Sequence, residues 1–482
     1  MQVNRRSFLK IAGATTVSAM LPVKGLSSVL SDRNKLSDKS LRNIYNEAYK
    51  KHPQRFNMCG YAAPKLETVR VGFIGVGSRG SAAVERISRI DGVKIMAICD
   101  IVNENAEKAK ARIQTPGHPA IIYSGKEDAW MEVCKRDDID LIYVGTPWEL
   151  HAPIGVYSMK EDKHVALEIP AATTVEGCWQ LVETSEQTRK HCVILENCCY
   201  DFFELLTLSL ARAGFFGEII HAEGAYIHEI GESLFFRGKP GRSWRLKENI
   251  KRNGNLYPTH GLGPVAQIMN INRGNQMEYM VSMSSNDFLM NKYAEELSQK
   301  EDYFKQFEGA TFRGNMNNSI IKTVKGQTIL IQHDITTPRP YSRLHTISGT
   351  KATAQKYPLD PRISVAENHK EWLTAEQFKE LELKYNPPVV QKMQEIAKEI
   401  GGHGGMDFLM DWRLIDCLRN GLPVDMDVYD AASWSVIGPL SEWSVANRSA
   451  PIDIPDFTNG SWKTNQPHDI SLTNGGTTGV IV

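Results

Sequence analysis

Residues 69–80 read VRVGFIGVGSRG, an apolar run that leads straight into a glycine-rich turn. The run is typical of a buried β-strand, and the next ten residues, SAAVERISRI, have the apolar spacing of a helix. A second apolar run, VKIMAICD, ends at Asp100, about 20 residues beyond the turn. Gly75, Gly77 and Gly80 form the G-x-G-x-x-G pattern of a dinucleotide-binding βαβ unit.

Each position of this fingerprint has a mechanical reason. Gly75 permits the tight turn, Gly77 lets the backbone approach a pyrophosphate, and Gly80 lets the helix pack closely on the strand. The helix N-terminus offers free N–H groups and partial positive charge to the phosphates. Asp100 can accept hydrogen bonds from the adenosine ribose, and its charge disfavours a 2′-phosphate. The sequence therefore predicts NAD as the cofactor rather than NADP.

The alternation of strand and helix continues beyond this unit. Further strand-like runs occupy residues 121–124, 140–146, 164–169 and 192–197, with helical stretches between them. This rhythm predicts an α/β fold, with a Rossmann domain and a doubly wound parallel sheet over residues 66–197. The ligand of such a sheet lies beyond the carboxyl ends of its strands.

Polar side chains stand where three of these strands end. The segment Thr146–His151 follows one strand, Glu168 ends another, and Asn197 closes the last. Any one of them alone would be interpreted as a loop cap or a core contact. Together, at one edge of a doubly wound sheet, they are predicted to surround the nicotinamide ribose and ring.

The pattern changes after this domain. Residues 201–213 are predicted to form a helix, and strands with longer loops follow, including GEIIHAEGAYIHE (217–229) and QTILIQHDITT (327–337). We expect residues 198–482 to form an α+β substrate domain with a largely open antiparallel sheet. Its polar and aromatic residues gather in four clusters: GRSWR (241–245), GNLYPTHGLG (254–263), PYSR (340–343) and GGHGGMD (401–407).

A Rossmann domain with an E-x-P strand end, followed by such a sheet domain, resembles the glucose–fructose oxidoreductase/inositol dehydrogenase (Gfo/Idh/MocA) superfamily. The clusters YPTHGLGP, RPYSRLH and GHGGMDFLMDWRL resemble, more narrowly, glycoside hydrolase family 109, typified by NAD-dependent α-N-acetylgalactosaminidases. The dehydrogenases of the superfamily usually carry lysine between the Glu and the Pro, where this chain has Ile169. The hydrolase family also lacks that lysine, so the departure favours it.

The resemblance implies site residues by position. It implies cofactor contacts at Ser78, Arg79, Asp100, Trp148, Glu149, Leu150, His151, Glu168, Ile169 and Asn197. It implies sugar contacts at Tyr226, Arg245, Tyr257, Pro258, Thr259, His260 and Tyr341. The residue chemistry agrees, because tyrosines stack on sugars and arginine donates to hydroxyl or acetamido oxygens.

His260 and Tyr257 are the candidate catalytic residues. His260 is the only obvious group of its segment that titrates near neutral pH, and Tyr257 could serve if a neighbouring cation lowered its pKa. Which of the two is the base stays open. His403 is not assigned to the site, because its flanking glycines could simply serve a turn.

The resemblance also implies an unusual reaction, since NAD-dependent glycosidases depart from the two-carboxylate mechanism. Tightly bound NAD would oxidise the sugar, allow elimination and water addition, and be regenerated in each turnover. The substrate would be a small molecule or glycan with a terminal N-acetylhexosamine. A plain NAD-dependent sugar or cyclitol dehydrogenase and a non-catalytic sugar-binding protein are the alternatives.

Composition excludes several other classes of protein. Lys and Arg together number 56, as do Asp and Glu, so the chain lacks the positive charge of a nucleic-acid binder. Eight cysteines in 482 residues are too sparse for a disulfide scaffold, and none has zinc-ribbon spacing. We expect Cys198 and Cys199 to be free buried thiols, and no metal site. A homodimer is possible, because sheets of this superfamily often pair.

The first residues carry a targeting pattern. Residues 4–10, NRRSFLK, precede the weakly hydrophobic run IAGATTVSAMLPV, which is the twin-arginine pattern and too short for a transmembrane helix. We expect residues 1–30 to be a signal peptide, recognised by the twin-arginine export machinery and leading to the periplasm or beyond. That route carries folded proteins, so a nicotinamide cofactor would be bound before export.

Overall fold

The computed structural model describes residues 36–235, 244–368 and 371–481. The predicted signal peptide, residues 1–30, lies outside these ranges, and so do residues 241–243 of the cluster GRSWR. Within the described part of the chain, no helix combines the length and apolarity that crossing a membrane requires.

The first sheet has six parallel strands in the order β3-β2-β1-β4-β5-β6. This is the doubly wound order, so the predicted Rossmann domain is confirmed. Its strands are apolar along their length because both faces are covered, and Val69, Val71 and Phe73 are fully buried. The strands are β1 (Val69–Ile74), β2 (Val93–Asp100), β3 (Ile121–Ser124), β4 (Leu141–Val144), β5 (His164–Leu167) and β6 (Cys192–Ile194).

Short turns follow two of these strands and carry predicted site residues. β4 and β6 end at Val144 and Ile194, earlier than predicted, because the polar residues after them leave the sheet. They form the 3₁₀ turns η1 (Trp148–Leu150) and η2 (Asn197–Tyr200). The helices of this domain are α4 (Ser78–Ser88), α5 (Asn103–Lys110), α6 (Ala129–Cys134), α7 (His151–Lys160) and α8 (Val175–Thr188).

The second sheet has eight strands in the order β13-β12-β11-β7-β10-β9-β8-β14. It is antiparallel, as predicted, except for one parallel pair formed by β7 and β10, the two strands that the sequence predicted. Tyr226 is paired with His333 in that register. The strands are β7 (Ile219–Ile227), β8 (Met277–Ser284), β9 (Met316–Thr323), β10 (Thr328–Asp334), β11 (Thr346–Gly349), β12 (Ala352–Gln355), β13 (Arg362–Val365) and β14 (Ile452–Asp453).

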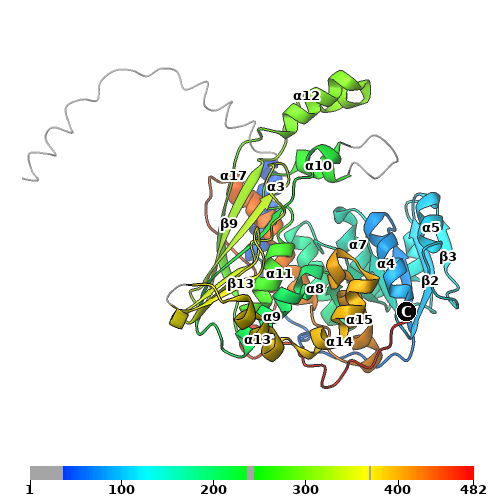
Figure 1. Cartoon of the computed structure of the whole chain (residues 1–482). Coiled ribbons are helices and arrows are strands. Elements are labelled where there is room, and N and C mark those ends of the chain that lie inside the picture. Colours follow the sequence, from blue (N-terminus) through cyan, green and yellow to red (C-terminus); the bar gives the residue numbers. More distant parts are fainter. Residues whose placement is uncertain (1–35, 236–243, 369–370, 482) are drawn as a thin grey trace, which may run out of the picture.

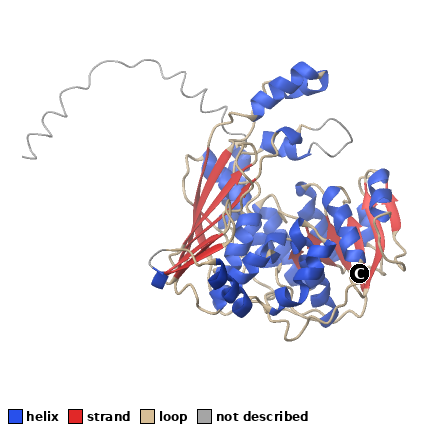
Figure 2. Cartoon of the chain, in the orientation of Figure 1, coloured by secondary structure: helices blue, strands red, loops and turns tan. Residues whose placement is uncertain are grey.

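The remaining helices are α3 (Asp38–Tyr49), α9 (Phe202–Arg212), α10 (Trp244–Lys251), α11 (Thr259–Ile268), α12 (Met290–Lys300), α13 (Ala375–Tyr385), α14 (Pro388–Ile400), α15 (Met406–Asn420), α16 (Val428–Ser435) and α17 (Ile437–Ala446). Most of them lie between or beside the two sheets, whereas α10 and α12 project at one end of the second sheet (Figures 1 and 2). α11 and α17 contact the second sheet at β7 and β8. α15 contacts α4 and β1, and α16 contacts β6 and α8, so the end of the chain returns to the first domain.

Helix α11 lies unusually close to strand β7. A Cβ atom at Gly261 would stand 2.2 Å from the backbone nitrogen of Ala225, and one at Gly224 would stand 2.4 Å from the Gly261 oxygen. Only glycine at both positions allows this approach, since real Cβ atoms essentially never come within 3.0 Å of a neighbour. Gly224 of β7 and Gly261 of α11 therefore bring His260 of α11 beside Tyr226 of β7.

A small separate core supports α10 and α12. Its buried members are Phe235, Leu246, Met290, Ala294, Phe304, Phe307 and Phe312. Burying these apolar side chains gives α10 a hydrophobic anchor of its own, away from the main core. This matters for the site because α10 begins with Trp244 and Arg245.

Candidate functional site

One cleft of about 980 Å³ opens beyond the carboxyl ends of β1, β2, β4 and β5. The glycine-rich turn and Asp100 line one part of it. Trp244, Arg245 and Tyr257 from the second half of the chain line another part. The predicted cofactor and sugar regions therefore share a single cleft, as expected at the carboxyl edge of a doubly wound sheet.

The three fingerprint glycines meet three different surroundings. Gly75 has a φ of +81°, in the left-handed region that favours glycine. A Cβ at Gly80 would stand 2.2 Å from the Gly75 oxygen, so a side chain there would separate helix from turn. A Cβ at Gly77 would meet no atom within 4 Å. Gly77 thus borders open space in the cleft, where the motif places a pyrophosphate.

Asp100 holds the glycine turn against the end of β2. Its Oδ2 accepts a hydrogen bond from the Val76 nitrogen at 3.0 Å. Its Oδ1 accepts one from the Val102 nitrogen at 2.9 Å and one from Asn105 Nδ2 at 3.2 Å. The carboxylate lines the cleft and keeps spare acceptor capacity, because two carboxylate oxygens offer about four lone-pair sites. This position fits a group that accepts hydrogen bonds from a ribose.

The segment after β4 is divided between surface and interior. Trp148 is buried, whereas Glu149 and Leu150 are exposed. His151 is buried, and its Nδ1 and Nε2 each lie 2.8 Å from a carbonyl oxygen, of Pro170 and Thr146 respectively. The structure therefore places His151 as a tie between the ends of β4 and β5. The Thr146 hydroxyl is buried at the cleft with no hydrogen-bond partner among the described residues.

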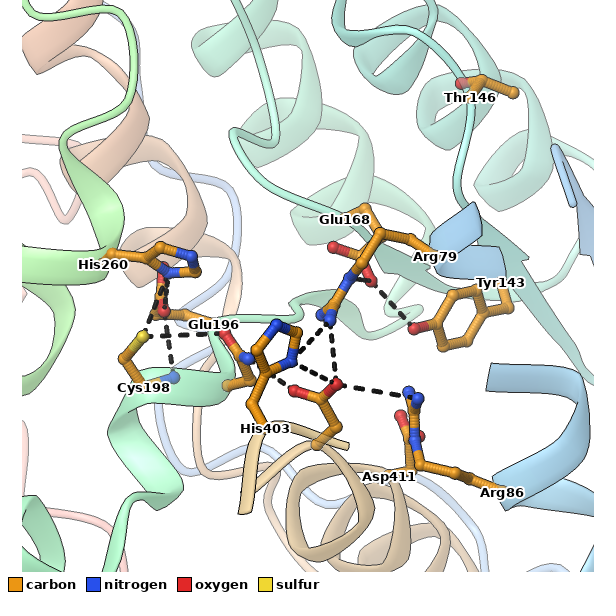
Figure 3. Close-up of polar contacts among 12 residues, drawn as sticks. Arg79, Arg86, Tyr143, Thr146, Glu168, Glu196, Cys198, His260, His403 and Asp411 are labelled. Carbon is orange, nitrogen blue, oxygen red and sulfur yellow. Dashed lines mark hydrogen bonds and ion pairs between the residues drawn. The ribbon is translucent and has the colours of Figure 1, made fainter. Parts of the chain in front are cut away.

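Arg79 of the fingerprint is bound from both halves of the chain (Figure 3). Its Nε lies 3.2 Å from Glu168 Oε1, and its Nη1 lies 2.8 Å from Oδ2 of Asp407, at the start of α15. His403 Nδ1 lies 2.8 Å from the same Asp407 oxygen. Asp407 also accepts a hydrogen bond from Asn197, so it ties two predicted cofactor residues together.

Sequence reasoning missed His403 and Asp407. The cluster GGHGGMD was noticed, but nothing in the sequence told which domain it would meet. Gly401, Gly402 and Gly404 all have φ between 75° and 92°, and a Cβ at Gly402 would stand 2.6 Å from the Asp407 Cβ. The glycines thus build the turn that lets α15 reach Arg79. Burial alone would raise the pKa of Asp407, yet His403, Arg79 and Arg86 hold that pKa well below its ordinary value.

Two predicted sugar contacts, Tyr226 and Tyr257, and the predicted cofactor contact Trp148 form an aromatic group around Arg245. Its guanidinium carbon lies 4.8 Å from the ring centre of Tyr257, 5.3 Å from that of Trp148 and 5.7 Å from that of Tyr226. Its Nη2 is buried and has no hydrogen-bond partner among the described residues. An unpaired buried donor is costly unless a ligand accepts from it. Sugar hydroxyl or acetamido oxygens fit that requirement.

The two candidate bases stand side by side but in different electrostatic surroundings. The ring centres of Tyr257 and His260 are 5.0 Å apart. Burial raises the pKa of Tyr257 well above its ordinary value, and the nearby charge of Arg245 only partly offsets this. Tyr257 is therefore the poorer base of the two. His260 Nδ1 lies 2.7 Å from Oε1 of the buried Glu196.

The other predicted sugar residues lie at different depths. Pro258 and Thr259 are buried at the start of α11, where they fix the entry of the helix. Tyr341 is 37 % exposed, and its ring centre lies 5.1 Å from that of His228. His228 Nδ1 is in turn 3.0 Å from the Tyr226 hydroxyl. Tyr341 thus joins the aromatic group at its outer edge.

Three groups of metal-ligand type meet beside the cleft. Ligand-type atoms of Glu196, Cys198 and His260 lie within 4.8 Å of one another. Burial raises the pKa of the Cys198 thiol well above its ordinary value, so the thiol is protonated at neutral pH. The three groups hydrogen-bond one another, and we interpret them as a polar cluster. Cys198 and Cys199 are buried and free of disulfides, as predicted.

Two family models match the chain. The model described as "Oxidoreductase family, NAD-binding Rossmann fold" matches residues 69–196. The model described as "Glycosyl hydrolase 109, C-terminal domain" matches residues 200–464, more than half of the chain. The chain belongs to glycosyl hydrolase family 109. It is thus a glycoside hydrolase with an NAD-binding Rossmann domain, and the resemblance predicted from its clusters is confirmed.

Relatives in family 109 match over most of their length. A protein of Porphyromonas gingivalis named "Glycosyl hydrolase family 109 protein" is 47% identical over 418 residues, covering 83% of this chain and 86% of the relative. A protein of Bacteroides fragilis named "Alpha-N-acetylgalactosaminidase" is 47% identical over 417 residues, covering 86% of this chain and 97% of the relative.

Solved structures resemble the family 109 chain in fold alone. A levoglucosan dehydrogenase in complex with NADH has a TM-score of 0.61 at 16% identity, covering 81% of this chain and 100% of its own. A scyllo-inositol dehydrogenase from Lactobacillus casei has a TM-score of 0.56 at 13% identity, covering 81% of this chain and 99% of its own. These likenesses support the Gfo/Idh/MocA fold that the sequence predicts.

Proposed function

We propose that this family 109 enzyme removes terminal α-linked N-acetylgalactosamine by a redox-neutral cycle with tightly bound NAD. The observation that carries the proposal is the shared cleft, in which Tyr257 lines the same space as Gly77 and Asp100. The ring of His260 adjoins Tyr257 there. The name of the Bacteroides fragilis relative, an α-N-acetylgalactosaminidase, supports the choice of sugar.

The residues present fit NAD. The open space at Gly77, the spare acceptor capacity of Asp100 and the unpartnered hydroxyl of Thr146 are each suited to one part of a dinucleotide. Bound NAD would supply a hydride acceptor for C3 of the sugar and return that hydride at the end of the turnover. Ile169 stands where a dehydrogenase would carry lysine, which favours hydrolysis over net oxidation.

The protein's own groups would handle the proton. A ketone at C3 acidifies the proton on C2, and the His260 imidazole would remove it. The glycosidic oxygen then leaves C1 and is protonated, and water supplies both that proton and the hydroxyl that adds to C1. After exchange with solvent, His260 returns a proton to C2. Arg245 would hold the sugar through its unpaired Nη2, with Tyr226 and Tyr257 packed around it. Atoms and electrons balance, since only water is consumed.

Isotopes distinguish this cycle from direct displacement at C1, which never breaks the C2–H bond. Protein purified without added cofactor should hydrolyse an aryl α-N-acetylgalactosaminide in deuterated water and place deuterium at C2 of the released sugar. Deuterium at C3 of the substrate should slow turnover, and NADH should not accumulate. Activity that survives cofactor removal, without C2 exchange or a C3 isotope effect, contradicts the proposal.

Two other outcomes identify the alternatives. Steady reduction of added NAD with an oxidised sugar product would identify a sugar or cyclitol dehydrogenase. Binding of N-acetylgalactosamine without turnover of any aryl glycoside would identify a sugar-binding protein. In both cases the fold stays as described, and the reaction assigned to it changes.

We also propose export through the twin-arginine route, which Arg5, Arg6 and the soft apolar run after them support. Replacing both arginines with lysine should leave the precursor in the cytoplasm of a Gram-negative host, measured by fractionation and immunoblotting. Mature protein reaching the periplasm from the double variant would contradict this route.

A further inference from the structure

A buried carboxylate lies against His260, on the ring nitrogen that would not face the sugar. Glu196, just before η2, is completely buried, and its Oε1 is 2.7 Å from His260 Nδ1. The Cys198 sulfur lies 3.1 Å from the same nitrogen. Figure 3 shows Glu196 and Cys198 together on one side of the imidazole. Neither residue was predicted as part of the site.

The contact fixes which nitrogen carries the proton. Burial alone would raise the pKa of Glu196, but the charge and hydrogen bond of His260 hold that pKa below its ordinary value. The carboxylate is therefore ionised near neutral pH and can only accept. The Nδ1 nitrogen must donate to it, so the imidazolium gives up its other proton, from Nε2, and Nε2 becomes the acceptor of the neutral imidazole. Among the described residues, no hydrogen bond is made to Nε2.

The backbone is arranged to hold this carboxylate. The Cys198 nitrogen donates to Glu196 Oε1 at 3.0 Å, so the acceptor oxygen is fixed from two directions. A Cβ at Gly263 would stand 2.8 Å from the Glu196 Cγ and 3.1 Å from the Cys199 sulfur. The last glycine of the cluster YPTHGLGP therefore leaves the room that the glutamate side chain occupies.

We propose that Glu196 is the positioning residue of the reaction, holding His260 as the Nδ1–H tautomer with Nε2 ready to take a proton. This rests on the proposed function, in which His260 removes the C2 proton. That proton goes to Nε2, the imidazolium is stabilised by the Glu196 carboxylate, and Glu196 itself stays ionised. The imidazolium exchanges that proton with solvent, and Nε2 then returns a proton to C2, so the dyad ends the turnover unchanged.

Other titratable or charged groups also face this dyad and must be considered in its pH dependence. They are Cys198 from η2, Tyr226 from β7, His228 just after β7, Tyr257 ahead of α11, Arg245 from α10, and Arg343 beyond Cys198. The Cys198 and Tyr257 pKa values are raised by burial, so both stay neutral at working pH. Glu196 is thus the negative charge in contact with the ring.

The test is Glu196→Gln, which keeps the shape and removes the charge. Its amide can turn an N–H toward Nδ1 and favour the wrong tautomer, so kcat should fall by about 10² or more while KM changes little. The acidic limb of the remaining pH–rate profile should move to lower pH, because the imidazolium loses its counter-charge. Glu196→Asp, which keeps the charge, should recover part of the lost kcat.

A matched control is Glu186→Gln. Glu186 is also a buried carboxylate, accepting from the Tyr429 hydroxyl at 3.0 Å and the Arg55 nitrogen at 2.7 Å, but it lies outside the cleft. It should leave the shape of the pH profile unchanged. A wild-type profile in Glu196→Gln, or an equal shift in Glu186→Gln, overturns the inference.

A second measurement needs no altered Glu196. Nitrogen-15 NMR of histidine-labelled wild-type protein, with the His260 signal assigned through His260→Gln, reports the tautomer directly. The inference requires protonated Nδ1, and an Nε2–H tautomer overturns it even if Glu196→Gln fails to fold. If the wild-type protein releases no sugar, the proposed function fails. If the wild-type enzyme is active but His260 is the Nε2–H tautomer, only the role assigned to Glu196 fails.

Discussion

The two halves of the cleft are built in opposite ways. On the cofactor side, Gly75, Gly77 and Gly80 belong to one strand–turn–helix unit, and Gly77 borders the open cleft. On the sugar side, Arg245 and His260 come from different helices, and each side chain acts only because its neighbours hold it. The cofactor side is therefore formed by residues close together in the sequence, whereas the sugar side is formed by residues that only tertiary packing brings together. We expect the cofactor side to be damaged by substitutions that add a side chain, and the sugar side by substitutions that remove a functional group.

The largest effect that distinguishes the sugar side from the cofactor side is expected at His260. His260→Ala should lower kcat by about 10²–10⁴-fold, the usual contribution of positioned proton transfer, while the NAD content of the purified protein stays at the wild-type level. Tyr257→Phe should cost far less, because burial raises the pKa of Tyr257 and disqualifies it as the base. Steady-state kinetics and cofactor quantification decide this. A larger loss in Tyr257→Phe than in His260→Ala would exchange their roles.

Asp407 tests whether the two halves are coupled. Asp407→Asn leaves Arg79 and the buried Arg86 without a shared carboxylate, and should lower the free energy of unfolding by about 3 kcal/mol at pH 7. The folded-state pKa of Asp407 is depressed, so its stabilisation is present above the unfolded pKa of about 3.9 and is lost below it. The difference from wild type should therefore shrink between pH 5 and pH 2.

Urea unfolding at several pH values measures this difference. The control is Asp162→Asn, because the Asp162 carboxylate is 84% exposed in its pair with Lys190 and should change stability little. A difference between Asp407→Asn and wild type that grew as the pH fell would contradict the electrostatic account.

Asp100 tests the cofactor side alone. Asp100→Ala should weaken NAD retention by about 1.5–3 kcal/mol, the value of hydrogen bonds to a charged group, and leave kcat at saturating NAD within a few-fold of wild type. Dialysis followed by cofactor quantification measures retention. Since Arg79 lines the same cleft and arginine can accommodate a 2′-phosphate, the identity of the released dinucleotide matters too. Recovery of mainly NADP from native protein would contradict the choice of NAD.

Two glycines of the fingerprint are expected to differ in role, Gly80 serving stability and Gly77 serving cofactor binding. Gly80→Ala puts a Cβ 2.2 Å from the Gly75 oxygen, so the protein without cofactor should lose about 1–3 kcal/mol of stability. Gly77→Ala puts a Cβ into open cleft, so the same protein should unfold at nearly the wild-type temperature but retain less NAD. Thermal unfolding with and without NAD separates the two. Equal losses in cofactor-free stability would show that Gly77 is also structural.

The features that could be predicted from the sequence are those formed by residues close together in the chain. The G-x-G-x-x-G spacing identified the turn, and the alternation of strands and helices identified the doubly wound parallel sheet and the edge where its ligand binds. The sequence could not assign Glu196, because a glutamate near the end of the apolar run CVILEN looks like an ordinary strand end until α11 packs on it. His403 and Asp407 were missed for the same reason, since their partner is Arg79 in the other domain. The choice between Tyr257 and His260 as the base depends on how deeply Tyr257 is buried, which the sequence alone does not reveal.

The ion pair of Arg79 with Asp407 can form only late in the synthesis of the chain. Its partners are 328 residues apart in the chain. At a translation rate of about 5–20 residues per second, the glycine turn waits roughly 16–66 s for its acidic partner to be synthesised. The first sheet can form early, whereas the full set of contacts around the cofactor turn exists only after α15 has emerged from the ribosome. A nascent chain stalled before residue 407 should therefore hold NAD more weakly than the finished protein.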